Sequence, residues 1–267
     1  MNIPCESIWL IQMTRVISVS GKGGTGKTTI AALILKVLVD IGKYDILAVD
    51  VDPDTNLPDV LNIEVYKTVG EAANELKKKI EQGSLSYGIS KRDLLEGWVY
   101  STLIEKEKFD LLVMGRTEGE GCYCYVNSVL TRILDTIISN YDIVLMDMEA
   151  GLEHLSRRTD KNVDAMLIVT DPSKMGFKTA KRIKELAKEV HIEIKDFYLI
   201  GNKFPSNFEN KFAEIARSIG IKPAGIVPED PYVYEYNLNG KSLFNLPNEA
   251  PALQAVKRIV NKIGLAL

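Results

Sequence analysis

The residues with the clearest chemical signature form a glycine-rich segment, GKGGTGKT, which runs from Gly21 to Thr28. It matches the pattern G-x-x-x-x-G-K-[ST], in which main-chain N–H groups surround phosphate oxygens. The segment lies between an apolar run and a helical pattern, so the positive end of a helix would favour an anion there. We predict that Lys27 reaches the β- and γ-phosphates of a nucleotide and that the Thr28 hydroxyl contacts Mg²⁺. The predicted nucleotide contacts here are Gly21, Lys22, Gly23, Gly24, Thr25, Gly26, Lys27, Thr28 and Thr29.

Two groups of carboxylates follow other apolar runs. Asp50 and Asp52 lie in LAVDVDPD, and Asp147 ends IVLMD. A carboxylate at the carboxyl end of a strand, facing the phosphates, can hold the water shell of Mg²⁺ or orient an attacking water. We therefore predict a magnesium site formed by Thr28, Asp52 and Asp147. In the alternative interpretation, Asp50, Asp52 and Asp54 form only a polar turn.

A Cys-x-Cys pair, Cys122 and Cys124, lies in the segment EGEGCYCY. Two thiols at this spacing point to the same side of an extended chain, and one pair supplies half of a four-thiolate site. A two-fold axis through the segment would bring the pairs of two subunits together. Thiolates suit zinc and copper(I), so the ligands alone leave the metal open. The other interpretation is two buried cysteines that act as small apolar residues.

The elements that must position these residues are short, nearly continuous apolar runs separated by helical patterns. Such runs are typical of strands buried on both faces of a parallel sheet. The predicted strands are Arg15–Ser20, Asp45–Asp50, Asp110–Gly115, Asp142–Asp147, Ala165–Thr170, Phe197–Asn202 and Ala224–Pro228. The predicted helices are Thr28–Val39, Gly70–Gln82, Asn127–Ser139, Ser173–Val190 and Ala252–Ile263.

This alternation predicts an α/β fold: a doubly wound, mostly parallel sheet of about seven strands with helices on both faces, as in P-loop NTPases. The stretch from Val51 to Phe109 is long for one crossover, so we expect inserted helices there. We interpret residues 1–267 as a single domain, with residues 1–13 as an extension before the first strand.

Composition excludes several other classes of protein. Of the 267 residues, 46% are hydrophobic and 26% are charged, which is ordinary for a folded globular protein. The net charge of −3 argues against a globally basic nucleic-acid-binding protein. No apolar run approaches the roughly 18 residues of a membrane span, and three cysteines do not form a disulfide framework. We expect a cytoplasmic protein with neither a nucleic-acid nor a membrane partner.

A second lysine in the loop, Lys22, makes GKGGTGKTT resemble the deviant Walker A motif. That motif belongs to the ATPase group of nitrogenase iron protein, the arsenite-pump ATPase and the Min/Par cell-organising ATPases. The resemblance implies ATP hydrolysis and a nucleotide-dependent homodimer in which Lys22 reaches the partner's nucleotide. It assigns the cis role to Lys27, water orientation to Asp52, and a phosphate-sensing switch to Asp147 and Gly151.

The same resemblance implies where adenine would bind. Asn202 in the GNK turn would contact the base, and the adjacent Lys203 is a further predicted nucleotide contact. The segment VPEDPYVYEY, which contains Pro228 and Asp230, is similar to the second adenine-side loop of the group.

Two further segments, EGEGCYCYVNS and DMEAGLEHLSRRT, resemble CooC-type ATPases. This resemblance implies nickel insertion into carbon monoxide dehydrogenase, or into acetyl-CoA synthase, with Ni²⁺ as the cargo and Zn²⁺ able to occupy the same thiolates. The residues after Asp147 hold no cysteine, which departs from nitrogenase iron protein. Two alternatives remain: a Min/Par-type positioning ATPase, suggested by the amphipathic segment AVKRIVNKIG, and a reductase carrying an iron–sulfur cluster.

Overall fold

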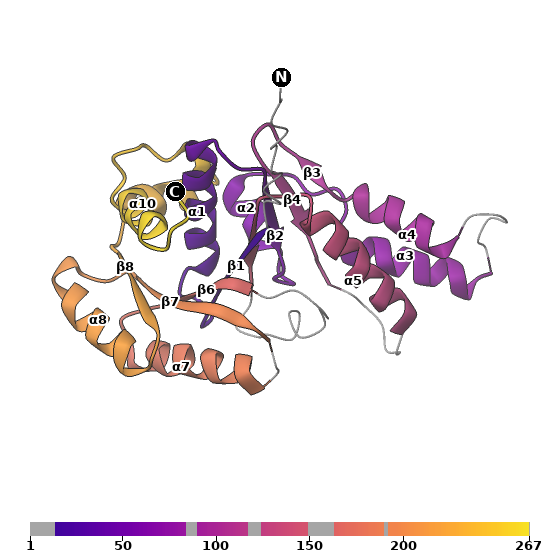
Figure 1. The fold of residues 1–267 in the computed structure, drawn as a ribbon. Coiled ribbons are helices and arrows are strands. Elements are labelled where there is room, and N and C mark those ends of the chain that lie inside the picture. Colours follow the sequence, from indigo (N-terminus) through magenta and orange to yellow (C-terminus); the bar gives the residue numbers. More distant parts are fainter. Residues whose placement is uncertain (1–13, 84–89, 117–123, 149–162, 190–191, 267) are drawn as a thin grey trace, which may run out of the picture.

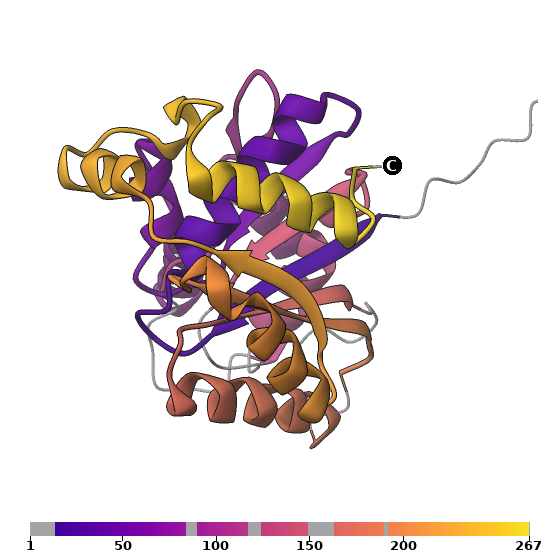
Figure 2. The ribbon, with the colours of Figure 1, turned by 90° about the vertical axis from the view of Figure 1, so that its left-hand side faces the viewer.

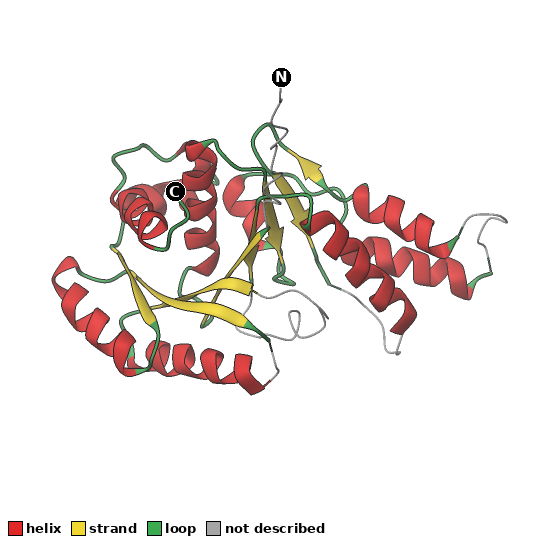
Figure 3. Ribbon diagram, in the orientation of Figure 1, coloured by secondary structure: helices red, strands yellow, loops and turns green. Residues whose placement is uncertain are grey.

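The structure, a computed structural model, describes residues 14–83, 90–116, 124–148, 163–189 and 192–266. Within these ranges eight strands form one sheet, in the order β3-β4-β2-β5-β1-β6-β7-β8 (Figures 1 and 3). Every neighbouring pair is parallel except β3 and β4. The strands are β1 (Arg15–Gly21), β2 (Ile46–Asp50), β3 (Ile104–Glu105), β4 (Asp110–Val113), β5 (Ile143–Asp147), β6 (Val163–Thr170), β7 (Ile194–Asn202) and β8 (Lys222–Val227).

The sheet confirms the predicted α/β fold, and all seven predicted strands are present. The additional strand, β3, spans two residues and pairs antiparallel with β4. A strand this short shows no periodicity that a sequence pattern could reveal.

Alternate side chains of the strands enter two separate cores, one on each face of the sheet. On β1, for example, Ile17 and Val19 belong to one core and Val16 to the other. The first core is covered by α1 (Lys27–Ile41), α2 (Asn56–Leu61) and α10 (Pro251–Lys262). The second is covered by α3 (Val69–Glu81), α4 (Lys91–Tyr100), α5 (Cys124–Ile138), α7 (Lys174–Glu189) and α8 (Glu209–Ser218). Figure 2 shows α1 and α10 above the sheet and α7 and α8 below it.

The long crossover after β2 carries α2, α3 and α4, as expected. Helices α3 and α4 lie side by side and project beyond the sheet (Figure 1). Thr68 caps α3 through a capping box with Glu71, and Ser90 caps α4 by accepting from the N–H of Asp93. We call this helical pair the α3–α4 arm.

Helices α8 and α9 (Pro231–Leu238) were not predicted as helices. The segment interpreted as an adenine-side loop is in fact largely the helix α9, capped by Asp230 with Pro231 in its first turn. Its sequence has almost no helical amphipathicity, and none of its residues is buried, so periodicity could not identify it. None of the helices in the described ranges is long and apolar enough to cross a bilayer.

Candidate functional site

The phosphate-binding loop joins β1 to α1. Gly24 and Gly26 adopt positive φ values of 78° and 85°, which favour glycine. The Thr25 hydroxyl donates to the Lys22 carbonyl at 2.8 Å and so helps to hold the turn. Helix α1 has no side-chain cap and no acidic residue in its first turn. Its first N–H groups therefore remain available to an anion, as a phosphate site requires.

A cavity of about 460 Å³ lies over this loop. Its lining combines the loop, the start of α1 and the segment that follows β2: Gly23, Gly24, Gly26, Lys27, Thr28, Thr29, Asp52, Asp54, Asn56 and Val60. Lys27 lines the cavity and is only 8% exposed, so most of the residue is removed from bulk water. A buried cation among free N–H groups can bind phosphate oxygens strongly.

Asp50 and Asp147 are register partners at the ends of neighbouring strands β2 and β5. Asp50 is fully buried and accepts hydrogen bonds from the N–H groups of Asp52 (3.0 Å) and Leu57 (2.9 Å). Burial raises the pKa of Asp50 to about 7, and the nearby Asp147 adds to the rise. Asp50 therefore supports the turn that carries Asp52. The alternative interpretation, in which the aspartates form a polar turn, describes Asp50.

Asp147 is 1% exposed, and neither of its carboxylate oxygens has a hydrogen-bond partner of normal geometry among the described residues. Burial raises its pKa to about 6, while the Thr28 hydroxyl and the Lys27 ammonium oppose that rise. A buried carboxylate with open oxygens, facing a hydroxyl and a phosphate-binding lysine, suits the water shell of Mg²⁺. Thr28, Asp147 and Asp52 are thus the residues that would hold the ion.

Removing the charge of Asp147 should stabilise the nucleotide-free protein by an amount that grows with pH. Its pKa is higher in the folded chain than the ordinary 3.8, so the folded state loses stability as pH rises through this range. We expect the free energy of unfolding of Asp147→Asn to equal that of wild type near pH 4. At pH 7.5 it should exceed the wild-type value by up to about 3 kcal/mol. Urea unfolding at both pH values measures this, with the exposed Glu107→Gln as control. A difference that does not change with pH would contradict the prediction.

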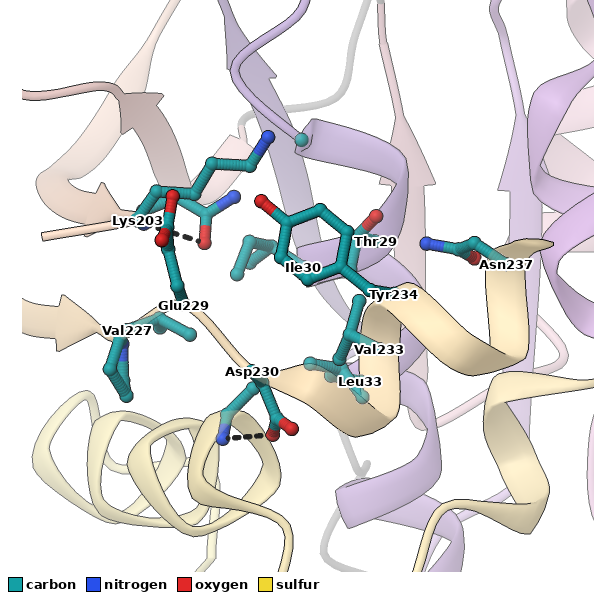
Figure 4. A pocket seen from close by; sticks show the side chains of 14 residues that line it. Thr29, Ile30, Leu33, Lys203, Val227, Glu229, Asp230, Val233, Tyr234 and Asn237 are labelled. Carbon is teal, nitrogen blue, oxygen red and sulfur yellow. Dashed lines mark hydrogen bonds between the residues drawn. The ribbon is translucent and has the colours of Figure 1, made fainter.

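A second pocket, of about 100 Å³, adjoins the phosphate cavity, since Gly26 and Thr29 line both (Figure 4). Its apolar wall comes from α1 and α9, and polar groups come from the ends of β7 and β8. Asn202 and Lys203 line it, as do Pro228 and Asp230, so the structure brings together all four predicted adenine contacts.

Asn202 also holds the phosphate-binding loop. Its Nδ2 donates to the Thr25 carbonyl at 2.8 Å, and its Oδ1 accepts from the N–H of Lys203 at 3.1 Å. A Cβ on Gly26 would lie 2.4 Å from that Nδ2, so this close approach requires glycine at position 26. The contact fixes the loop relative to the base-side pocket.

Asp230 supports the pocket by joining two of the helices around it. Its Oδ1 accepts from the N–H of Tyr232 at 2.9 Å and its Oδ2 from the N–H of Ala252 at 2.8 Å. The buried carboxylate thereby ties the first turn of α9 to the first turn of α10. This arrangement indicates a supporting role, and a direct base contact by Asp230 stays a prediction.

Tyr234 is a pocket residue that the sequence reasoning did not single out. Its side chain is 54% exposed at the edge of the pocket, and the Lys203 ammonium lies 6.0 Å from the ring centroid. Figure 4 shows the ring reaching from α9 toward Thr29 and Ile30 of α1. The aromatic residues of VPEDPYVYEY were the available signal, but only the fold shows which of them faces the pocket.

We expect Tyr234→Ala to weaken ATP binding by about 5- to 150-fold, because base–aromatic stacking contributes about 1–3 kcal/mol. Binding of tripolyphosphate, which has no base, should stay unchanged. Isothermal titration calorimetry with both ligands measures the difference. Tyr232→Ala is the matched control, since Tyr232 lies on the same helix outside the pocket lining. Equal losses for ATP and tripolyphosphate would show that Tyr234 acts on the whole site instead of the base.

Two predicted residues, Cys122 and Gly151, lie outside the described residues. Cys124 is the first residue of α5. This helix therefore begins three residues before the predicted start at Asn127. The main chain at Cys124 is helical, so the geometry of an extended chain does not apply at that residue. Among the described residues, no group of three or more His, Cys, Asp or Glu side chains could hold a metal ion.

Comparison with known proteins gives four results. A sequence profile of the CobQ/CobB/MinD/ParA nucleotide-binding domain matches residues 16–244. An uncharacterized ATP-binding protein of Methanocaldococcus jannaschii is 46% identical over 93% of this chain and 98% of its own. The carbon monoxide dehydrogenase accessory protein CooC of Rhodospirillum rubrum is 29% identical over 93% of this chain and 97% of its own. Among solved structures, a ParA family ATPase from Chlorobium tepidum superposes with a TM-score of 0.69 at 20% identity, covering 94% of this chain and 99% of that one.

Proposed function

The chain belongs to the CobQ/CobB/MinD/ParA family and is a P-loop ATPase, and from that premise we propose that it is a nickel metallochaperone. In this proposal, ATP hydrolysis is coupled to insertion of nickel into carbon monoxide dehydrogenase or a related nickel enzyme. The observation that carries it is the Cys122–Cys124 pair in a chain similar over nearly its whole length to a carbon monoxide dehydrogenase accessory protein.

The position of the cysteines along the chain supports a link to the nucleotide. Cys122 lies between β4 and α5, and Cys124 is the first residue of α5. Strand β4 neighbours β2, whose carboxyl end leads into Asp52. The crossover that carries the thiols therefore leaves the sheet at the edge where the phosphate cavity opens. Because Cys124 begins α5, its main chain lies at the N-terminus of that helix, the end that carries a partial positive charge.

The proposed cycle uses two chains. ATP binding would join two protomers, with Lys22 of each reaching the nucleotide of the other. Cys122 and Cys124 of both chains would then supply four thiolates to one metal ion, the usual number for a closed site. Hydrolysis would separate the chains and leave a two-thiolate site that releases the ion. Nickel is the cargo, and zinc can occupy the same ligands.

The Min/Par-type alternative depended on a free amphipathic helix at Ala255–Gly264. In the structure this segment lies largely in α10, whose residues Leu253, Val256 and Val260 are buried in the core shared with α1 and β8. An apolar face that is already covered cannot also bind a membrane surface, so this segment gives no support to membrane association. Membership of the family stays compatible with a Min/Par-type function.

Metal stoichiometry tests the proposal. We expect equilibrium dialysis with Ni²⁺ or Zn²⁺ to give one tightly bound metal per dimer with ATP and Mg²⁺, and much weaker binding with ADP. Cys122→Ala or Cys124→Ala alone should nearly abolish tight binding, since either leaves two thiolates per dimer. ATP hydrolysis should persist in both variants, and Cys5→Ala serves as the control.

Two further readouts separate the alternatives. Lys22→Ala should bind ATP but lose both the ATP-dependent dimer, measured by light scattering, and the tight metal site, because the two are thermodynamically linked. The reductase alternative predicts visible absorbance from an iron–sulfur cluster, which the nickel- or zinc-bound protein lacks. One tight metal per monomer that survives the double cysteine substitution would rule out the bridging-thiolate site.

A further inference from the structure

An ion pair joins the loop that carries Asp52 to the end of β4. The Nη2 of Arg116 donates to Oδ1 of Asp54 at 2.6 Å. Asp54 lies on the lining of the phosphate cavity, and its N–H donates to Oδ1 of Asp52 at 2.9 Å. Arg116 is therefore connected to the predicted water-orienting carboxylate through one intermediate residue.

The main chain at Arg116 packs closely against the first turn of α3. The Gly70 N–H donates to the Met114 carbonyl at 2.8 Å. A Cβ on Gly70 would lie 2.4 Å from the Arg116 carbonyl oxygen, and one on Gly115 would lie 2.6 Å from Oγ1 of Thr68. Such close approach leaves the end of β4 little freedom to move relative to the α3–α4 arm.

The Asp52 loop is held at two points. At its base, the buried Asp50 accepts from the N–H groups of Asp52 and Leu57. Farther along, the side chain of Asp54 is held by Arg116. We infer that Arg116 is a positioning residue for ATP hydrolysis: through Asp54 it ties the Asp52 loop to the α3–α4 arm and keeps Asp52 directed at the phosphates.

The size of the effect follows from exposure. The side chains of Arg116 and Asp54 are 70% and 60% exposed, and solvent-exposed ion pairs make small contributions. Arg116→Ala should therefore lower kcat by about two- to five-fold, not abolish it. KM for ATP should stay unchanged, because the residues that surround the phosphates are unaltered.

A double-mutant cycle tests this inference. Asp54→Ala removes the carboxylate but keeps the N–H that donates to Asp52, so it should reproduce the kcat of Arg116→Ala. The double variant Arg116→Ala/Asp54→Ala should lose no more than either single variant. The exchanged pair Arg116→Asp/Asp54→Arg should recover part of the lost turnover. Arg92→Ala is the matched control, since Arg92 pairs with Glu96 on the surface of α4.

Steady-state phosphate release at saturating and limiting ATP gives kcat and KM, and thermal unfolding shows that each variant is folded. Unchanged kcat in Arg116→Ala would overturn the inference. So would a raised KM at constant kcat, or losses that multiply in the double variant. The experiment concerns hydrolysis alone, so its outcome is independent of whether Cys122 and Cys124 bind a metal.

Discussion

Asp52→Asn should leave ATP bound and slow its hydrolysis by about 100-fold or more. Asp52 lines the phosphate cavity and is 7% exposed, and its Oδ1 accepts from the N–H of Asp54. Asparagine keeps the size of the side chain and can accept the same hydrogen bond, so the loop should keep its shape. It cannot take a proton from an attacking water, and positioned acid–base groups contribute about 10²- to 10⁴-fold to rate.

Phosphate release under single-turnover conditions measures the chemical step, and calorimetry measures ATP affinity. Asp59→Asn is the control, because Asp59 is an exposed carboxylate on α2 outside the cavity lining. If Asp52→Asn turned over ATP at the wild-type rate, Asp52 would have no part in orienting water. The carboxylate that acts would then have to be sought elsewhere.

Lys27→Ala should have the opposite signature, with ATP affinity reduced by about 100-fold. The lysine lies on the wall of the phosphate cavity and is largely buried, so its interaction with phosphate is poorly screened by water. Each hydrogen bond to a charged group contributes about 1.5–3 kcal/mol, and the ammonium can make more than one to the β- and γ-phosphates. The substitution also leaves Asp147 without the cation that lowers its pKa, which further disfavours its ionised, Mg²⁺-binding form.

Titration calorimetry with MgATP measures this loss. Lys43→Ala, at the far end of α1 and exposed, should bind ATP as wild type does. The comparison with Asp52→Asn is informative, since one variant should lose binding and the other turnover. Wild-type affinity in Lys27→Ala would mean that the nucleotide does not bind in the cavity over this loop.

The sequence alone was sufficient for features that depend on local order. The glycine pattern from Gly21 to Thr28 predicted the phosphate-binding loop, because positive-φ turns and a following helix need residues only a few positions apart. The strands of the parallel sheet were predicted for a similar reason, since each is a continuous apolar run that can be recognised without knowledge of the rest of the chain. The two-residue β3 and the helix α9 lack such a pattern and were missed.

Tertiary structure decided which chemically similar residue does what. Asp50, Asp52 and Asp147 are alike in sequence. Only the fold shows that the oxygens of Asp50 accept from main-chain N–H groups, while those of Asp147 have no hydrogen-bond partner of normal geometry among the described residues. Asn202 reaches the Thr25 carbonyl across 177 positions of the chain, and Asp230 binds the N–H of Ala252 across 22.

The arginine at position 116 illustrates the same limit, since it lies 62 positions after Asp54 in the chain. Contacts of this kind form where parallel strands bring their carboxyl ends to one edge. Their partners are set by strand order, which no local pattern in this chain specifies. The sequence therefore determined that a phosphate site exists and where it begins, and the order of the strands determined which distant side chains complete it.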